Sequence, residues 1–284
     1  MKLASFSTAD GGGYGCVVGD GIVTLSTAFG DRAPTLRDLL AGGLLGEAAA
    51  LAKASTPDLA LSDVAFEPVI PNPDKIICVG LNYRDHVAET GRTVTDKPAL
   101  FARYAGSQIG HLAPLVKPRA SDEFDYEGEL AVIIGRGGRH IAPHAALAHV
   151  AGYACYNEGS IRDWQRHTSQ FLSGKTFAGT GAFGPWMVTS DEIADPSKLK
   201  LETRINGQVV QHTTTDLLIT DIPHLIAYIS TILPLVPGDV IVSGTPGGVG
   251  AKRNPPLWMR PGDVAEVEIS GIGVLRNPVV AEAM

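Results

Sequence analysis

Cysteine is scarce in this sequence of 284 residues, and no CxxC pair occurs. The three cysteines, Cys16, Cys78 and Cys155, are widely separated and odd in number, so neither a disulfide framework nor a thiolate zinc site is indicated. Each cysteine lies in an apolar, strand-like segment. We therefore predict that all three are small buried hydrophobic side chains and not reactive thiols.

Basic residues are too few for a typical nucleic-acid binder. The chain has 23 Lys and Arg against 30 Asp and Glu, a formal net charge of -7, whereas a nucleic-acid binder usually carries a basic surplus that neutralises phosphates. Nucleic acid is therefore not an expected partner. An anionic small molecule is still compatible with the composition, because a bound cation inverts the charge of its surroundings.

Long apolar runs are also missing. The most apolar late stretch, residues 225–236, is too short to span a bilayer and contains Pro234, and residues 1–10 lack the apolar core of a secretory signal. We expect a cytoplasmic protein without a membrane partner. Hydrophobic residues make up 44% of the chain and charged residues 19%, which excludes wholesale disorder and is typical of a globular enzyme.

The first seventy residues have the pattern of a small α+β module. Helical apolar spacing covers residues 35–54, although Gly42 and Gly43 weaken it. Asp20-Gly21 is a hairpin signal, and the proline-dense segment 67–73 is the best boundary. We predict a small N-terminal domain over residues 1–70 and a larger one over 71–284. Short strands are expected at residues 2–6, 15–18 and 21–25.

Beyond the boundary the chain is rich in strands, with scattered helices. Asn206-Gly207 is a strong hairpin signal, and Asp221 or Thr220 can cap a helix over residues 223–232. The strands do not alternate regularly with helices, so a doubly wound parallel sheet is not expected. We predict a mixed α/β, mainly β fold. Its strands are expected at residues 75–79, 130–134, 152–156, 199–205, 208–211, 240–243 and 264–269.

Glu127 and Glu129 are the sharpest chemical signal in the sequence. They are two residues apart before an apolar run, so on a strand both side chains would project from one face. Two adjacent buried carboxylates repel each other and need a cation or a shared proton. Oxygen ligands without cysteine favour Mg²⁺, Mn²⁺ or Ca²⁺. The alternative is a pair of solvated glutamates at a strand edge, and this segment alone leaves both possibilities open.

A second group of polar residues begins at Glu158, where an apolar segment ends. Arg162 and Gln165 are four and seven residues further on, and would share a helix face with Glu158 if a helix began there. The alternative is a capped helix start with solvated charges.

A third group contains His86 and Glu89, spaced so that one helical turn lets the carboxylate orient the imidazole as a general base. A lone histidine is more often structural. The polar segment 90–98 that follows suits a mobile lid.

Two glycine-containing segments could bind anions. Ser169 stands where a Walker motif needs glycine, so the segment around Lys175 is not a phosphate-binding loop, and Lys175 is instead a candidate charge for a carboxylate or an enolate. In residues 244–250 the glycines would let backbone N–H groups approach an anionic ligand, with Thr245 adding a hydroxyl. A tight structural turn is the alternative there.

Taken together, these segments resemble the fumarylacetoacetate hydrolase family. The matching motifs fall in the family's order and cover nearly everything from Pro73 to Asn277. They are GLNYRDHVAE (80–89), DYEGELAVIIGR (125–136), NEGSIRDWQ (157–165), GKTF (174–177), GPW (184–186), SGTPGGVG (243–250) and RPGDVAEVEISGIGVLRN (260–277). The segment 103–107 departs from the commoner Lys-Pro-Pro-Ser form, so the distal end of the pocket is expected to differ.

The resemblance implies a fold, an assembly and a metal site. The fold would be the family's mixed β-sandwich roll with a small N-terminal α+β domain, and the assembly a homodimer. The metal, Mg²⁺ or Mn²⁺ with Ca²⁺ as a further option, would be held by Glu127, Glu129 and Glu158. The last of these stands where the family usually has Asp.

The resemblance also implies roles for the remaining site residues. The lid dyad of the family maps onto His86 and Glu89, and its lysine maps onto Lys175. Gln165 is expected to act in catalysis as a donor to the attacked carbonyl. Substrate-binding roles are expected for Arg162, Thr245, Tyr83 and Gly244.

The expected reaction is hydrolysis of a C–C bond in an acylpyruvate-like 2,4-dioxo acid, in the breakdown of aromatic compounds or sugar acids. His86 would deprotonate water, and the metal and Lys175 would stabilise the pyruvate enolate that leaves. The alternative is a decarboxylase, isomerase or hydratase acting on a related 2-oxo acid through the same enolate. A non-catalytic ligand-binding protein is a third possibility, but it would have no need for a base.

Overall fold

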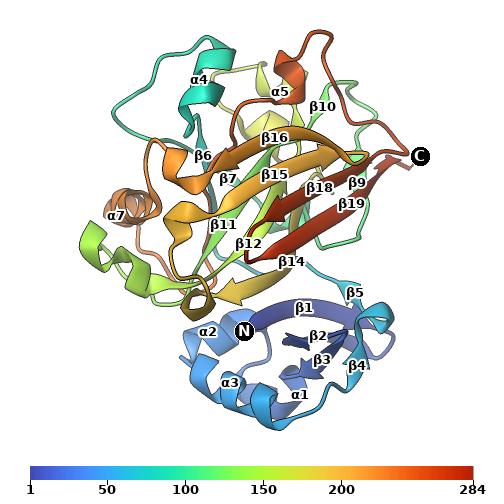
Figure 1. Ribbon diagram of the computed structural model, residues 1–284, viewed down its shortest axis with the longest axis vertical. Coiled ribbons are helices and arrows are strands. Elements are labelled where there is room, and N and C mark those ends of the chain that lie inside the picture. Colours follow the sequence, from blue (N-terminus) through green and yellow to red (C-terminus); the bar gives the residue numbers. More distant parts are fainter. Residues whose placement is uncertain (284) are drawn as a thin grey trace.

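The computed structural model describes residues 1–283, and strands dominate its regular structure (Figure 1). A large mixed sheet contains, in spatial order, β4 (Leu59–Ala60), β3 (Gly21–Thr24), β2 (Gly11–Val18), β1 (Lys2–Thr8), β14 (Gly181–Thr189), β12 (Val150–Glu158), β11 (Gly128–Ile134), β17 (Val240–Val242), β6 (Ile76–Gly80) and β7 (Ala99–Arg103). Two short strands join it from the side, β5 (Ala65–Phe66) and β8 (Gln108–Ile109). The fold is mixed α/β and mainly β, as the sequence predicts.

A second, five-stranded sheet packs on one face of the central strands β11, β12 and β14. It contains, in spatial order, β16 (Gln208–Thr214), β15 (Lys200–Ile205), β18 (Val264–Ile269), β19 (Gly273–Ala281) and β9 (Leu115–Lys117). Leu130 and Val132 of β11 meet Leu201 and Val267 of this second sheet in one apolar cluster. The sandwich buries that face of β11 away from water.

The opposite face of β11 is buried as well. Ala131 and Ile133 share an apolar cluster with Leu36 and Leu39 of α2 (Leu36–Ala41). Because both faces are covered, every residue of β11 is buried, and after Glu129 its sequence is a continuous apolar run rather than an alternating one. The same holds for β12. Polar side chains at the ends of these two strands are therefore held inside the protein.

The first strands continue the large sheet instead of forming a sheet of their own. Lys2 and Leu3 of β1 pair with Val188 and Met187 of β14, so the N-terminal segment, blue in Figure 1, adds its strands to one end of the molecule. The domain division at residue 70 stays a prediction.

Two details of the N-terminal segment were predicted incorrectly. Residues 35–54 form two helices, α2 and α3 (Leu45–Ala54), because the chain turns at Gly43, whose φ is +66°. The β2–β3 hairpin turns at Gly19-Asp20 rather than at Asp20-Gly21, since Val18 already pairs with Gly21. Gly19 adopts the left-handed conformation, with a φ of +58°, that such a turn requires.

Other local predictions are confirmed. Asn206 and Gly207, with φ of +52° and +77°, join β15 to β16, and Asp221, not Thr220, caps α7 (Ile222–Ile232) by accepting from the His224 N–H. The remaining helices are α1 (Ser26–Phe29), α4 (Arg84–Thr90), α5 (Arg162–Gln165) and α6 (Leu172–Lys175). Within residues 1–283, no helix has the length and apolarity needed to cross a membrane.

The three cysteines occupy the interior, as predicted. Cys16, Cys78 and Cys155 are all buried and free. Burial raises the pKa of the thiol of each one, to about 12 for Cys155. Raised thiol pKa values disfavour the reactive thiolate.

Candidate active site

Three glutamates converge where β11 begins and β12 ends. These strands are antiparallel neighbours, with Gly128 opposite Asn157, so Glu127 and Glu129 on one strand meet Glu158 on the other. Each carboxylate offers an oxygen, and these oxygens all lie within 4.8 Å of one another. The three residues are at most 2% exposed. The predicted trio is thus a buried cluster.

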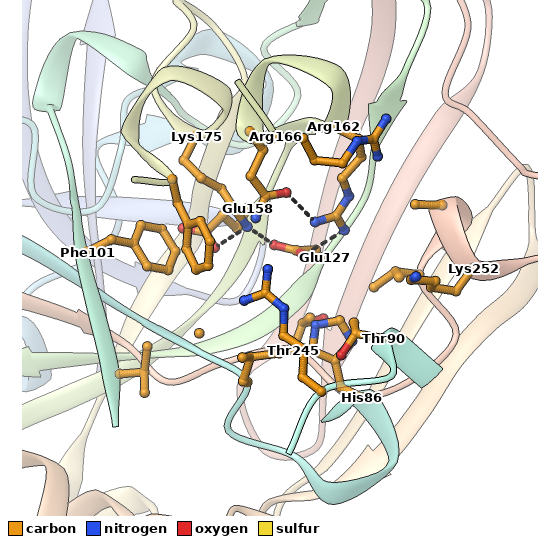
Figure 2. Close-up of a pocket in the computed structure, with 18 of the residues that line it drawn as sticks. His86, Thr90, Phe101, Glu127, Glu158, Arg162, Arg166, Lys175, Thr245 and Lys252 are labelled. Atoms are coloured by element: carbon orange, nitrogen blue, oxygen red, sulfur yellow. Dashed lines mark hydrogen bonds and ion pairs between the residues drawn. The ribbon is translucent and has the colours of Figure 1, made fainter. Parts of the chain in front are cut away.

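Two buried cations lie against this cluster. Lys175 donates from Nζ to Glu127 and, over 2.9 Å, to Glu158 Oε2. Arg162 donates from one Nη to Glu127 Oε1 and from Nε to Asp125 Oδ2, both over 2.7 Å. Figure 2 shows these contacts around Glu127 and Glu158. The arrangement holds the first carboxylate between two positive charges.

The local charges push the carboxyl pKa values apart. Burial alone would raise the pKa of Glu127, but the charges of Arg162 and Lys175 outweigh it and hold that pKa below its ordinary value. Burial, followed by the charges of Glu158 and Glu127, raises the pKa of Glu129 well above its ordinary value. Burial alone would lower the pKa of Lys175. The charges of Glu127 and Glu158 outweigh burial and raise that pKa above its ordinary value of 10.5.

The buried charged groups carry a net negative charge that a divalent cation would neutralise. Four carboxylates, those of Asp125 and the three glutamates, face only the two cations Arg162 and Lys175, which leaves two negative charges when all are ionised. Glu158 Oε1 is also buried without a hydrogen-bond partner in the part of the chain that the structure describes. An all-oxygen donor set with an orphaned ligand atom fits a hard divalent cation such as Mg²⁺ or Mn²⁺.

His86 and Glu89 form the predicted dyad on the short helix α4. His86 Nδ1 lies 2.7 Å from Glu89 Oε1, and the second glutamate oxygen accepts from the Gly248 N–H over 2.9 Å. The histidine is buried and lines the cavity, whereas Glu89 lies behind it. Pairing at Nδ1 leaves Nε2 as the ring nitrogen available to the cavity.

One cavity of about 480 Å³ brings the glutamate cluster and the histidine together. In Figure 2, His86 and Thr90 of α4 lie on the side opposite Glu127, Glu158 and Lys175. Phe101 and Phe171 form an aromatic wall, with ring centroids 5.6 Å apart and edge to face. Such a concave pocket with an apolar wall and a few convergent polar groups is the usual form of a small-molecule site.

Three further cations line the cavity. Arg166 is paired with Glu123 over 2.5 Å. Arg92 and Lys252 have no ion-pair partner among residues 1–283, and the Arg92 guanidinium lies 5.4 Å from the Phe171 ring centroid. Arg92 beside Phe171 and Lys252 elsewhere on the lining could each bind an anionic group of a ligand.

The expected substrate-binding residues have different surroundings. Arg162, Gln165 and Thr245 line the cavity, but Tyr83 and Gly244 do not. Tyr83 is buried with an unpartnered hydroxyl among the described residues, and the Gly244 N–H donates to Glu129 Oε2 over 2.5 Å. Gln165 Oε1 accepts from Arg162, so its amide nitrogen can still donate into the cavity. The substrate-binding roles stay predictions.

The helix that carries Arg162 and Gln165 does not begin at Glu158, which was the condition for a shared helix face. Glu158 is the last residue of β12, the short strand β13 (Ser160–Ile161) follows, and α5 starts only at Arg162. Glu158 is therefore not on a helix face with Arg162 and Gln165. The three residues meet because β12 ends beside the cavity that α5 borders.

Sequence reasoning missed several residues of the cavity and its support. Asp125 stands inside a recognised motif, and its position two residues before Glu127 on the same strand-like segment could have identified it. Arg92 lies in the polar segment that suggested a lid. Phe101, Phe171 and Lys252 carry no local signal, because only the fold brings them to the cavity.

Known proteins match this chain over most of its length. The sequence model of the family described as fumarylacetoacetate (FAA) hydrolase C-terminal matches residues 75–280. The human mitochondrial oxaloacetate tautomerase FAHD2A is 42% identical over 267 residues, 92% of this chain and 85% of that protein. The Xenopus laevis mitochondrial oxaloacetate tautomerase fahd2 is 38% identical over 99% of this chain and 90% of that protein.

A solved structure extends the comparison to the whole fold. Maleylpyruvate hydrolase from Sphingobium sp. SYK-6, solved in complex with manganese(II) ion and pyruvate, is 30% identical, with a TM-score of 0.83 and 100% of both chains covered. This chain is an enzyme of the fumarylacetoacetate hydrolase family.

Proposed function

We propose that this enzyme interconverts the keto and enol forms of a small 2-oxo dicarboxylic acid. The observation that carries the proposal is the placement of the His86–Glu89 dyad and the buried glutamate cluster on opposite sides of one cavity. Enolisation needs a base at the carbon beside the ketone and positive charge at the ketone oxygen. Relatives with 38% and 42% identity are named oxaloacetate tautomerases.

The glutamate cluster would hold the reactive end of the substrate. Glu127, Glu129 and Glu158 would bind a divalent cation, and that cation would supply positive charge for the 2-oxo oxygen and the adjacent carboxylate. Lys175 adds a second, permanent positive charge beside Glu127 and Glu158. Together these charges favour the enolate over the ketone.

His86 would move the proton. Its Nδ1 is bound to Glu89, so Nε2 is the nitrogen that takes a proton from C3 of the ketone. The C3–H electron pair forms the C2=C3 double bond, the carbonyl π pair moves to the oxygen, and protonation of that oxygen gives the enol. Glu89 stabilises the imidazolium that exists between the two proton transfers.

The distal carboxylate would lie near Arg92 and Lys252. Both side chains line the cavity and have no ion-pair partner within the described residues. Replacement of Arg92 by Gln is expected to raise KM for a 2-oxo dicarboxylic acid at least tenfold and to change KM little for a monocarboxylic analogue. The exposed Arg84 of α4, eight residues before Arg92, provides the control variant Arg84→Gln.

Enol absorbance of oxaloacetate provides the direct test. The enzyme with Mg²⁺ or Mn²⁺ should speed the approach to the keto–enol equilibrium, and His86→Asn should reduce that rate by 100-fold or more. Glu89→Gln should reduce it less. A wild-type enzyme that leaves the uncatalysed rate unchanged with either metal would refute the proposal.

Hydrolysis of a C–C bond in an acylpyruvate is the second candidate. The aromatic wall of Phe101 and Phe171 gives the cavity an apolar zone beside Lys175, which suits an acyl group. The Gln165 amide could donate to the attacked carbonyl, and a relative with 30% identity is named maleylpyruvate hydrolase. Release of pyruvate from a panel of acylpyruvates, measured beside enol decay, would separate the two reactions.

The proposed assembly is a homodimer, and the proposed location is the cytoplasm. The human relative is named as mitochondrial, so the location stays open to direct test by fractionation. Light scattering of the purified protein at several concentrations would establish the number of subunits. A monomer at micromolar concentration would refute the proposed dimer.

A further inference from the structure

The glycine-rich loop, residues 244–251, binds carboxylates of the protein itself. The sequence left open whether its backbone N–H groups approach an anionic ligand or form a tight structural turn. In the structure, five of them donate to acidic side chains. These bonds are Gly244 to Glu129 (2.5 Å), Gly247 to Asp85 (3.1 Å), Gly248 to Glu89 (2.9 Å), and Gly250 and Ala251 to Asp125 (2.7 and 3.0 Å). Glu129 and Asp125 belong to the glutamate side of the cavity, whereas Asp85 and Glu89 belong to α4. The loop therefore connects the two halves of the site.

The loop is fixed firmly to the glutamate side. Gln211 is 2% exposed, accepts from the Gly128 N–H over 2.9 Å, and donates to Thr245 Oγ1 over 2.8 Å and to the Pro246 carbonyl over 3.0 Å. Thr245 in turn donates to the Gly128 carbonyl. Because Gly128 lies between Glu127 and Glu129, these bonds set the position of the loop relative to both carboxylates.

By contrast, α4 has few anchors of its own. It contains seven residues, of which only His86 and Val87 are buried. A helix this short is unstable without external contacts. The Asp85 carboxylate supplies one, because Oδ2 accepts from the Gly247 N–H of the loop while Oδ1 accepts from the His86 N–H of the helix. Asp85 thus joins the histidine's own backbone to the loop.

The Asp85 contact is separate from the contact made by Glu89. Glu89 bridges the His86 ring to the Gly248 N–H and so orients the imidazole. Asp85 touches neither the ring nor the cavity, and acts on the start of the helix. The two carboxylates therefore control different properties, Glu89 the ring and Asp85 the backbone that carries it.

We propose that Asp85 is a positioning residue, which holds α4 on the glycine-rich loop and thereby fixes His86 opposite the glutamate cluster. The inference rests on the proposed function, because it takes His86 as the base. Asp85→Ala removes both N–H contacts, so α4 can shift relative to the loop. A displacement of about 1 Å at a reacting group lowers a rate by roughly 100-fold.

The test compares the wild type with Asp85→Ala, Asp85→Asn and the control Asp58→Ala. Asp58 also accepts a backbone N–H, that of Thr24 over 2.8 Å, but in the N-terminal segment. Four quantities are measured: Mn²⁺ affinity, kcat, KM for oxaloacetate enol, and amide hydrogen exchange of residues 84–92. Asp85→Ala should lower kcat at least tenfold and speed exchange, with Mn²⁺ affinity and KM within threefold of wild type. Asp85→Asn keeps one acceptor oxygen, so its kcat and its exchange rate should lie between those of the wild type and those of Asp85→Ala. Asp58→Ala should match the wild type in all four quantities.

The outcomes separate this inference from the proposed function. Unchanged kcat in Asp85→Ala, unchanged exchange, or an equally large loss of Mn²⁺ affinity would overturn the positioning role, the last because it would indicate a general structural defect. Wild-type enzyme inactive on oxaloacetate and on acylpyruvates would overturn the proposed function instead. Hydrogen exchange needs no turnover, so it reports on the attachment of α4 in either case.

Discussion

At the scale of single residues, Glu158 is the site residue whose side-chain length matters most. It stands where the family usually has aspartate, and its longer side chain reaches Lys175 while leaving Oε1 without a partner among the described residues. Glu158 is 2% exposed and lines the cavity. The length of this side chain is therefore matched to the position of Lys175 and to the other two carboxylates.

Replacement of Glu158 by Asp should weaken metal binding. The shorter side chain withdraws both oxygens by about 1.5 Å, one carbon–carbon bond length, which breaks the 2.9 Å contact with Lys175 and moves a proposed ligand. We expect Mn²⁺ affinity to fall at least tenfold, as measured by titration calorimetry. Glu47→Asp, at an exposed glutamate paired with Arg32, is the control. Equal affinities for the variant and the wild type would remove Glu158 from the metal site.

His111 should make the protein less stable in mild acid. Burial, followed by the nearby charge of Arg276, lowers its pKa from 6.5 to about 4, and its Nδ1 accepts from the Arg276 N–H over 3.0 Å. Between about pH 6.5 and 4 the unfolded chain binds a proton that the folded protein does not, so stability falls as pH falls through this window.

Substitution tests this linkage. His111→Asn keeps an acceptor near Nδ1 but cannot titrate. The slope of its free energy of unfolding against pH, between pH 6.5 and 4, should therefore be smaller than that of the wild type. The difference in slope should correspond to at most one bound proton. Urea unfolding at a series of pH values measures this slope. His212→Asn, at an exposed histidine of β16, should leave the slope unchanged. A wild-type slope retained in His111→Asn would show that other groups cause it.

Two pairs of site residues could be predicted from short-range spacing alone. Glu127 and Glu129 are two apart on a strand, and His86 and Glu89 are three apart on a helical turn, so local geometry alone brings each pair together. Phe171 meets Phe101 across a distance set only by the complete fold. No local pattern could have predicted that contact.

At the scale of elements, the same distinction explains which boundaries were predicted. The turn at Asn206-Gly207 requires positive φ at both residues, and asparagine and glycine adopt positive φ at a lower conformational energy than other residues. The break near Gly43 was foreseen only as a weakness, because helical apolar spacing continues on both sides of it. The strand end at Glu158 was misassigned because its polar successors have helical spacing, whereas pairing with β14 extends the strand.

A pair of glycine substitutions tests these local conformations. Gly207→Ala places a side chain at a φ of +77° with nothing within 4 Å, so we expect a loss of about 1 kcal/mol of stability from backbone strain alone. Gly46→Ala, in α3 and also with open space around it, should instead stabilise the protein by a few tenths of a kcal/mol. Denaturant unfolding measures both. Equal effects of the two substitutions would contradict the assigned conformations.

At the scale of the whole molecule, the large sheet joins the N-terminal segment to the site. Leu3 and Tyr14 share one apolar cluster with Ala131 of β11, Tyr156 of β12 and Met187 of β14. Pairing of β1 with β14 adds backbone hydrogen bonds to this contact. The strands that carry the glutamate cluster are therefore buried on one face partly by residues from the first seventy positions.

This shared core predicts that the protein unfolds as one unit, although its sequence suggests two domains. Trp186 packs against the apolar cluster that contains Ala4 and Phe6 of β1 and would sense the N-terminal segment, so the test uses a Trp186→Phe variant. The fluorescence of the remaining tryptophans, Trp164 and Trp258, then reports on the larger part, whereas a thiol-reactive probe can follow exposure of Cys16 in β2. In urea the two signals should change with the same midpoint, because loss of β1 would expose the apolar cluster behind β11 and leave β14 with an unpaired edge. An earlier Cys16 transition that left the tryptophan signal and Mn²⁺ binding intact would show instead that the N-terminal segment is a separate domain. In that case the two-sheet sandwich alone would stabilise the metal site.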